Sequence, residues 1–210
     1  MKSIKISYIL LAVFILLLSF MFYIYNINSY EKEFSKNNAY EKYNKTFVDD
    51  VGKNLINYFK SNEELGNYYS QREILHLEDV KNLIRKTLTL FYITFTFLLL
   101  SFIYLATRKY YNELSKILIY GGIICILLIF LFVILFFIDF NSSFIKFHEI
   151  FFNNDLWILS SESLLVNLFT EEFFFNILKK ILITSIVFSL ISITSGIIIQ
   201  KAYKSTSAKQ

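Results

Sequence analysis

Two histidines offer the clearest chemistry in the sequence, because each lies beside acidic residues that could orient an imidazole. The chain contains only His76 and His148, and four carboxylates accompany them, at Glu78, Asp79, Glu149 and Asp155. Imidazole is the side chain whose ordinary pKa, ~6.5, lies near neutral pH. Two imidazoles in one site could therefore supply both a general base and a general acid.

Other kinds of site have weaker support. Two histidines plus carboxylates could bind zinc, but the chain has no H-E-x-x-H spacing and no cluster of ligand residues, so no metal site is expected. It has no G-x-S-x-G element of a serine hydrolase and no glycine-rich nucleotide loop, so we expect no cofactor. The single cysteine, Cys125, lies in an apolar run, where a thiol is inert.

Four nearly charge-free stretches must position these histidines in a membrane. The sequence is 55% hydrophobic with a mean hydropathy of +0.49, too apolar for an ordinary soluble domain. The stretches cover about residues 6–25, 88–107, 117–138 and 177–199, and each reaches the roughly 20 residues that cross a hydrocarbon core. We therefore predict an all-α membrane protein with four transmembrane helices in a single domain, residues 1–210. The first stretch ends in bulky residues where a signal peptidase needs small ones, so we expect an uncleaved span.

Basic residues indicate the orientation of the chain. They flank the spans on one side, with Glu113 as the only acid among them, at Lys2, Lys5, Arg108, Lys109, Lys116, Lys201, Lys204 and Lys209. The loops formed by residues 26–87 and 139–176 are balanced or acidic. Because cytoplasmic loops carry an excess of lysine and arginine, we expect cytoplasmic termini and two extracytoplasmic loops. The net charge of +4 is then an insertion signal, and no nucleic-acid partner is expected.

The first extracytoplasmic loop is expected to be helical. An amphipathic helix over about residues 44–60 is predicted by apolar residues at helical spacing, at Val48, Val51, Leu55, Ile56 and Phe59. Another helix is expected to begin near Arg72 and to continue without a break into the second span. In that helix His76 and Asp79 are three residues apart and share one face.

The second extracytoplasmic loop is expected to hold a short interfacial helix. Ser142 or Ser143 could cap a helix over about residues 144–152, whose phenylalanines suit the membrane interface. Apolar residues on both sides of residues 160–163 indicate a possible β-hairpin. Thr170 is predicted to cap the helix that leads into the fourth span, with acidic residues in its first turn.

Two segments together resemble a known family. His76-Leu77-Glu78-Asp79-Val80-Lys81 resembles an H-x-E-D-V element, and Phe147-His148-Glu149-Ile150-Phe151-Phe152 resembles an F-H-x-x-F-F element. The second element continues with Trp157 and with Leu168-Phe169-Thr170-Glu171-Glu172-Phe173-Phe174. These elements, with four spans and paired outer-face histidines, resemble the lipoprotein intramolecular transacylase (Lit) family of low-GC Gram-positive bacteria.

The resemblance implies a reaction and a role for each candidate residue. A membrane acyltransferase of this kind would move the sn-2 acyl chain of a diacylglyceryl lipoprotein to the α-amine of its N-terminal cysteine, giving the lyso form. His148 would be the base toward the amine and His76 the acid or oxyanion partner, although the roles could be reversed. The four carboxylates would orient the imidazoles. Acyl chains would contact an aromatic set that comprises Phe147, Phe151, Phe152 and Trp157. Partners would be the diacylated lipoprotein and membrane lipids.

Two alternatives of other classes remain open at the level of sequence. The long helical first loop also suits a non-enzymatic membrane sensor or assembly subunit, although the segment after Lys201 is too short for an output domain. A transporter fragment would carry charges at mid-membrane, and the four spans carry none. Conversion of a synthetic diacylated lipopeptide by the purified protein would separate an enzyme from both.

Overall fold

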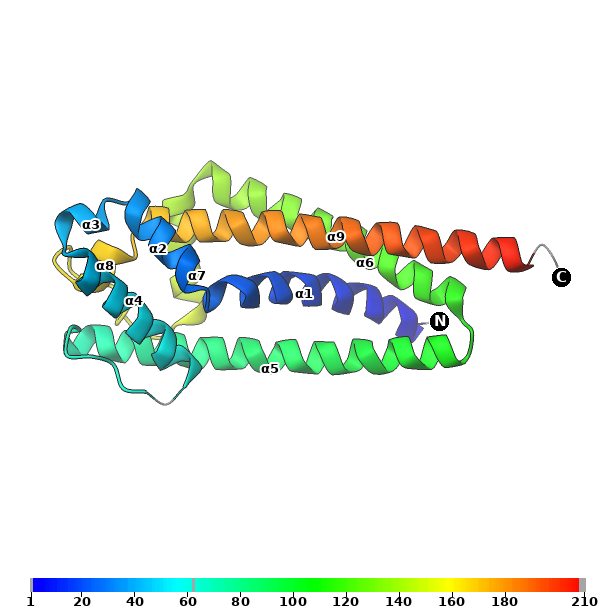
Figure 1. Cartoon of the computed structure of the whole chain (residues 1–210), viewed down its shortest axis with the longest axis horizontal. Helices are drawn as coiled ribbons and strands as arrows, with labels where there is room; N and C mark the ends of the chain where they lie inside the picture. The colour runs from blue at the N-terminus through cyan, green and yellow to red at the C-terminus, as the bar shows by residue number, and fades with distance from the viewer. Residues whose placement is uncertain (1, 62, 208–210) are drawn as a thin grey trace. The chain divides into compact units, whose positions relative to one another are not determined.

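The computed structural model describes residues 2–61 and 63–207, and four long helices dominate it (Figure 1). They are α1 (Lys2–Ile24), α5 (Gln71–Thr107), α6 (Tyr111–Ile138) and α9 (Glu171–Ser207). Each is long and apolar enough to cross a membrane, as expected for a protein with four transmembrane helices. By backbone contacts the chain divides into two compact units.

The first unit contains Met1–Phe20, Leu88–Ile134 and Ile181–Gln210, which are parts of the four long helices. Small residues allow α6 and α9 to pack closely. A Cβ on Gly122 would lie 2.8 Å from the Ser189 carbonyl oxygen, and a Cβ on Gly196 would lie 2.8 Å from that of Ser115. The Ser192 hydroxyl of α9 donates a 2.8 Å hydrogen bond to the backbone carbonyl of Leu118 in α6. Such small-residue contacts are typical of helix pairs in membranes.

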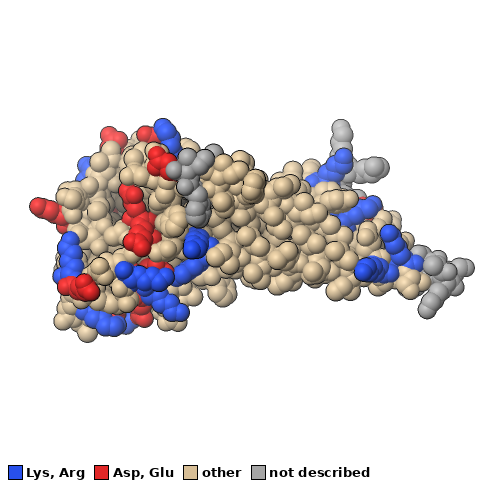
Figure 2. All heavy atoms as spheres, turned by 90° about the horizontal axis from the view of Figure 1, so that it is seen from above, with Lys and Arg blue, Asp and Glu red and all other residues tan. Residues whose placement is uncertain are grey.

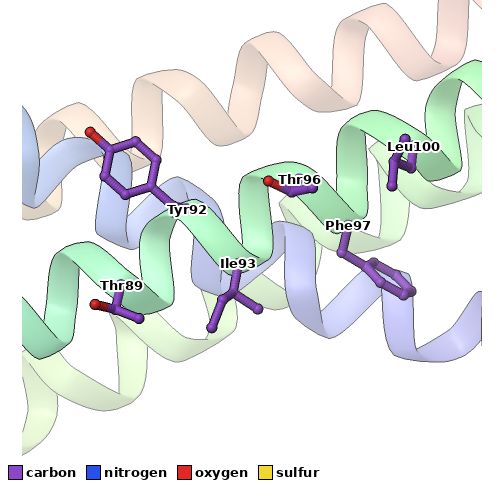
Figure 3. A pocket seen from close by; sticks show the side chains of 6 residues that line it. All are labelled: Thr89, Tyr92, Ile93, Thr96, Phe97 and Leu100. Carbon is purple, nitrogen blue, oxygen red and sulfur yellow. The ribbon is translucent and has the colours of Figure 1, made fainter.

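A hollow of about 560 Å³ lies along α5 within this unit (Figure 3). Its lining is mainly apolar and comes from Thr89, Tyr92, Ile93, Thr96, Phe97 and Leu100. The six side chains project from successive turns of one helix, so the hollow is a feature of the α5 surface. It contains neither histidine.

The second unit contains Met21–Thr87 and Leu135–Lys180 and therefore holds both predicted loops. Three helices of the first loop, α2 (Ile27–Lys36), α3 (Ala39–Lys42) and α4 (Lys45–Lys60), pack against one another. The predicted amphipathic helix is confirmed: Asn44 caps α4, and its apolar face is buried. The buried ring of Phe34 contacts aromatic rings at 5.4–6.5 Å, namely Tyr30, Tyr40, Phe169 and Phe173.

The second loop differs from its prediction at two places. The helix α7 (Phe140–Phe151) begins four residues earlier than expected, because the Asp139 carboxylate, not Ser142 or Ser143, caps it by accepting the Ser142 N–H. The predicted β-hairpin is wrong: no strand occurs within residues 2–61 and 63–207, and residues 164–168 form the short helix α8 (Leu164–Leu168). Thr170 caps α9 as predicted, by accepting the Phe173 N–H.

Charge is distributed differently over the two units. In the view of Figure 2, the second unit displays acidic and basic side chains together. The first unit displays a long uncharged surface with lysine and arginine side chains at its end. An uncharged surface of this kind suits contact with lipid chains, where a charged group is costly.

Candidate functional site

His76 lies near the start of α5 in the second unit. Ser70 and Glu73 form a capping box at this helix start, in which the Ser70 N–H donates to the Glu73 carboxylate at 2.7 Å and the Glu73 N–H faces the Ser70 hydroxyl. One turn later His76 is buried, with 9% of its surface exposed, and its Nδ1 has no hydrogen-bond partner among the described residues. As predicted, the helix continues from this turn into the second span without a break.

His148 lies in the last turn of α7 and is the buried residue of that helix. Its Nδ1 is 2.7 Å from the backbone carbonyl oxygen of Phe144, one turn earlier. A carbonyl oxygen can only accept, so Nδ1 carries the proton in this hydrogen bond. The other ring nitrogen, Nε2, is therefore left with its lone pair when the imidazole is neutral.

The two imidazoles lie close together although 72 positions separate them in the sequence. Their ring centroids are 6.1 Å apart and their planes are inclined by 35°. The buried ring of Phe152 contacts both, at 5.3 Å from His76 and 5.6 Å from His148. A single substrate group could therefore reach both histidines.

Burial keeps both imidazoles in the neutral form. It lowers the pKa of His76 to about 4, assisted by the nearby His148 and opposed by the charge of Asp79. Burial also lowers the pKa of His148, opposed by the hydrogen bond to the Phe144 carbonyl. A neutral imidazole can accept a proton at one nitrogen and donate one from the other, as general acid–base chemistry requires.

Aromatic rings enclose His148 on several sides. The indole of Trp157 stacks on it, with centroids 5.0 Å apart and planes inclined by 29°. Phe144 lies at 4.4 Å and Phe147 at 5.5 Å. Phe151 contacts Phe147 at 4.7 Å and is half exposed, so it lies at the rim of the aromatic cluster. The sequence analysis placed Phe144 in the interfacial helix but not in the aromatic set of the site, although its spacing of four residues from His148 was an available signal.

The four predicted carboxylates make other contacts than those expected. Asp79 accepts a 2.8 Å hydrogen bond from the Asn154 amide, and Glu149 forms a 2.8 Å ion pair with Lys146. Glu78 and Asp155 are exposed. In the described part of the chain, no carboxylate forms a hydrogen bond with either imidazole, so orientation of the rings by these acids remains a prediction.

The sequence analysis assigned no role in the site to two polar residues that lie near it. Arg72 donates from Nε to the Ile158 carbonyl at 3.0 Å and from Nη2 to the Asp155 carbonyl. Asn154 donates to Asp79 and also accepts the Leu156 N–H at 3.0 Å. The two bonds of Arg72 and the bond between Asn154 and Asp79 join α5 to the loop that carries Trp157. The signal for Arg72 in the sequence was its helical spacing from His76 and Asp79, which places the three on one face of α5.

A second hollow, of about 550 Å³, lies in the same unit but is lined by residues of the first loop and lacks both histidines. No group of three or more His, Cys, Asp or Glu side chains within the described residues could hold a metal ion.

The model of the lipoprotein intramolecular transacylase Lit family matches residues 5–174, a range that contains both histidines and the aromatic rings around them. No curated protein sequence matches the chain.

Solved structures of the lipoprotein intramolecular transacylase Lit from Bacillus cereus have the same fold. One is 24% identical, covers 97% of each chain and has a TM-score of 0.87. A histidine-to-alanine variant of that protein is 23% identical with a TM-score of 0.82, over 97% of this chain and 95% of the other. Since the family match covers most of the sequence and the fold agrees throughout, the chain belongs to the lipoprotein intramolecular transacylase family.

Proposed function

We propose that His76 and His148 are the catalytic residues with which this chain carries out the transacylation of its family. The reaction moves the sn-2 acyl chain of a diacylglyceryl lipoprotein from its glyceryl ester oxygen to the α-amine of the N-terminal cysteine. The observation that carries the proposal is the pair of buried imidazoles, 6.1 Å apart, brought together from the two separate loops. Amine and ester belong to one substrate molecule, so their proximity favours the reaction without a second reactant.

His148 is assigned the role of general base. Its Nδ1–H is held by the Phe144 carbonyl, and its Nε2 lone pair is free to take a proton. When the amine nitrogen attacks the ester carbon, the new C–N bond forms and the excess proton of the amine passes to Nε2. The lowered pKa of His148 keeps this lone pair available at neutral pH.

His76 is assigned the role of general acid or oxyanion partner. Attack on the ester places a negative charge on the carbonyl oxygen, which an N–H donor stabilises. The C–O bond to the glyceryl group then breaks, and the leaving oxygen receives, through His76, the proton that His148 took from the amine. Protons lost by the amine and gained by the glyceryl oxygen balance, so the reaction needs no water, oxidant or second lipid. Each transfer is typically worth ~10²–10⁴-fold in rate.

The exposed aromatic rings suit the acyl chains of such a substrate. Phe147 and Phe151 are 38% and 50% exposed beside the buried histidine pair. They could contact hydrocarbon while the ester reaches the imidazoles, with α7 lying at the membrane interface. The distribution of lysine and arginine supports cytoplasmic termini and an extracytoplasmic site.

The test is conversion of a synthetic diacylated lipopeptide by the detergent-purified protein, followed by mass spectrometry of the peptide N-terminus. We expect the N-acyl, lyso product from the unmodified chain and none from H76A or H148A. The matched control is N82A, an exposed position on the same helix as His76, which should convert at the normal rate. Conversion by either histidine variant would refute the assignment of catalysis to this pair.

The same assay separates the enzyme from a sensor or assembly subunit. A non-enzymatic subunit would leave the lipopeptide unchanged even when it is folded and monodisperse. Folding of each preparation is checked by far-ultraviolet circular dichroism.

A further inference from the structure

Two polar contacts lie on either side of His76 and hold the same loop. Arg72 is one turn before His76 on α5, and Asp79 is one turn after it. Arg72 binds the carbonyl oxygens of Asp155 and Ile158, and Asp79 binds the side chain of Asn154. The loop formed by residues 153–158 is thus fastened at both ends to the helix face that presents His76.

The loop is also ordered internally between these fastening points. The Asn154 side chain accepts the Leu156 N–H at 3.0 Å, and the Ile158 N–H donates to the Asp155 carbonyl at 3.1 Å. The Asp155 carbonyl therefore receives both the turn hydrogen bond and one arm of the Arg72 guanidinium. Trp157 lies within this turn, so hydrogen bonds hold the backbone on both sides of it, at Asp155 and at Ile158.

This turn places the indole of Trp157 beside His148. The indole stacks on His148 at 5.0 Å, while the same α5 face carries the second imidazole. We propose that Arg72 is a positioning residue for the transacylation, which holds Trp157 on His148 so that both imidazoles face one substrate. This inference rests on the proposed function. It adds a residue that hydrogen-bonds to the backbone of the loop that carries Trp157 and thereby sets the position of the indole on His148.

Arginine suits this role because of its planar fork of donors. Its Nε and Nη2 reach two carbonyl oxygens three residues apart, which the single ammonium of lysine cannot match in the same geometry. R72K should therefore hold the turn by one contact and behave between the unmodified chain and R72A. A purely electrostatic role for Arg72 would instead leave R72K normal.

Trp157 provides a direct reporter because it is the only tryptophan in the chain. In R72A we expect its fluorescence emission to shift to the red and its quenching by acrylamide to increase, since the indole loses its place on His148. The second fastening point gives an independent variant, N154A, for which we expect the same changes. K86A removes an exposed cation from the same helix and should leave the emission unchanged.

Activity is measured on the same preparations with the diacylated lipopeptide. A displacement of active-site groups by about 1 Å can lower a reaction rate by roughly 10²-fold, so we expect R72A to slow the conversion step by roughly 10- to 100-fold. R72K should lose less than R72A. Thermal melting followed by circular dichroism identifies any variant that fails to fold, and N154A then replaces it.

Each outcome is decisive. Unchanged emission in R72A and N154A would overturn the claim that these contacts hold Trp157. A changed emission with a normal conversion rate would overturn the positioning role. Neither result would affect the proposed function, which fails if H76A or H148A retains conversion or if the folded, unmodified protein converts no lipopeptide.

Discussion

Glu73 of α5 and Leu165 of α8 are joined across the second unit by a hydrogen bond of 2.9 Å from the Leu165 N–H to the Glu73 carboxylate. The other carboxylate oxygen accepts both the backbone N–H and the hydroxyl of Ser70. One buried carboxylate therefore completes the start of the helix that carries His76 and the start of α8.

We expect E73A to lower the stability of the protein by about 2 kcal/mol, because it leaves buried backbone donors without partners. The measurement is thermal or denaturant unfolding in detergent. E73Q retains one good acceptor oxygen and should lose less. E78A, at an exposed position of the same helix, is the matched control and should change stability by less than about 0.5 kcal/mol. Equal stability of E73A and E78A would contradict a capping role for Glu73.

This contact also explains where the sequence analysis stopped being informative. A charge-free run of about 20 residues is a local property, so all four spans were predictable, as was α4 from the spacing of its apolar residues. The short helix α8 was mistaken for a hairpin although Ser163 caps it locally, and the Glu73 carboxylate, 92 positions earlier, also supports its start. The start of α7 was missed because Asp139, Ser142 and Ser143 are all suitable caps.

The two histidines of the proposed site also combine a local signal in the sequence with an arrangement that only the fold creates. Both histidines were singled out because of their rarity and their acidic neighbours, but their approach to 6.1 Å depends on how the two loops pack. The contacts of Arg72 go to backbone carbonyl groups, which every residue possesses. No pattern of side chains marks such an acceptor, so only the folded structure reveals this residue.

A buried ion pair joins α2 to α9 in the second unit. The side chain of Glu33 is fully buried and lies 2.7 Å from Lys180 and 3.4 Å from Lys36. We expect K180A to destabilise the fold by about 3 kcal/mol, because it removes the nearest cation from a buried carboxylate. K36A removes an exposed partner and is the control, with a loss below about 1 kcal/mol. The measurement is unfolding of both variants and of E33Q/K180A, which should recover part of the loss.

The same pair gives stability a defined pH dependence. Burial raises the pKa of Glu33, but the hydrogen bond and charge of Lys180, together with Lys36, outweigh it, so the pKa lies below its usual value. The unfolded chain then binds this proton more readily than the folded one. Stabilisation by the pair is complete above the ordinary glutamate pKa of about 4.3 and is lost as the pH falls through the lowered value. Unfolding of the unmodified chain and of E33Q/K180A between pH 3 and 7 should show this difference, and parallel curves would contradict it.

Close packing of α6 on α9 makes Gly122 sensitive to any side chain. An added Cβ would meet the Ser189 carbonyl oxygen at 2.8 Å, so the backbones would have to separate. We expect G122L to lower the melting temperature in detergent more than A106L does. The control adds a side chain at an exposed position of the same unit. A similar melting temperature for both variants would show that the α6–α9 contact tolerates bulk.

The proposed orientation predicts which positions are accessible in intact cells. An impermeant maleimide should label E162C, an exposed position in the second loop, and should fail to label K109C between the second and third spans until the membrane is opened. The native Cys125 is buried and gives the background. Labelling of K109C in sealed cells, with protection of E162C, would reverse the topology and place the site on the cytoplasmic side.

Direct titration of the two imidazoles tests the electrostatics of the site. The chain contains only two histidines, so isotope-labelled histidine gives two sets of nuclear magnetic resonance signals, which H76A and H148A assign. Burial should place the midpoint of His76 near pH 4 and that of His148 below the ordinary value of ~6.5.

Because the unfolded imidazoles bind protons at higher pH than the folded ones, stability should fall as the pH decreases from about 6.5 toward 4. The conversion rate is a poorer probe, since the substrate α-amine itself titrates near ~7.7–8.0. D79N removes the charge that raises the pKa of His76, so the titration midpoint of His76 should move further down in this variant. A midpoint at or above ~6.5 for both rings of the unmodified protein would contradict a buried, neutral pair.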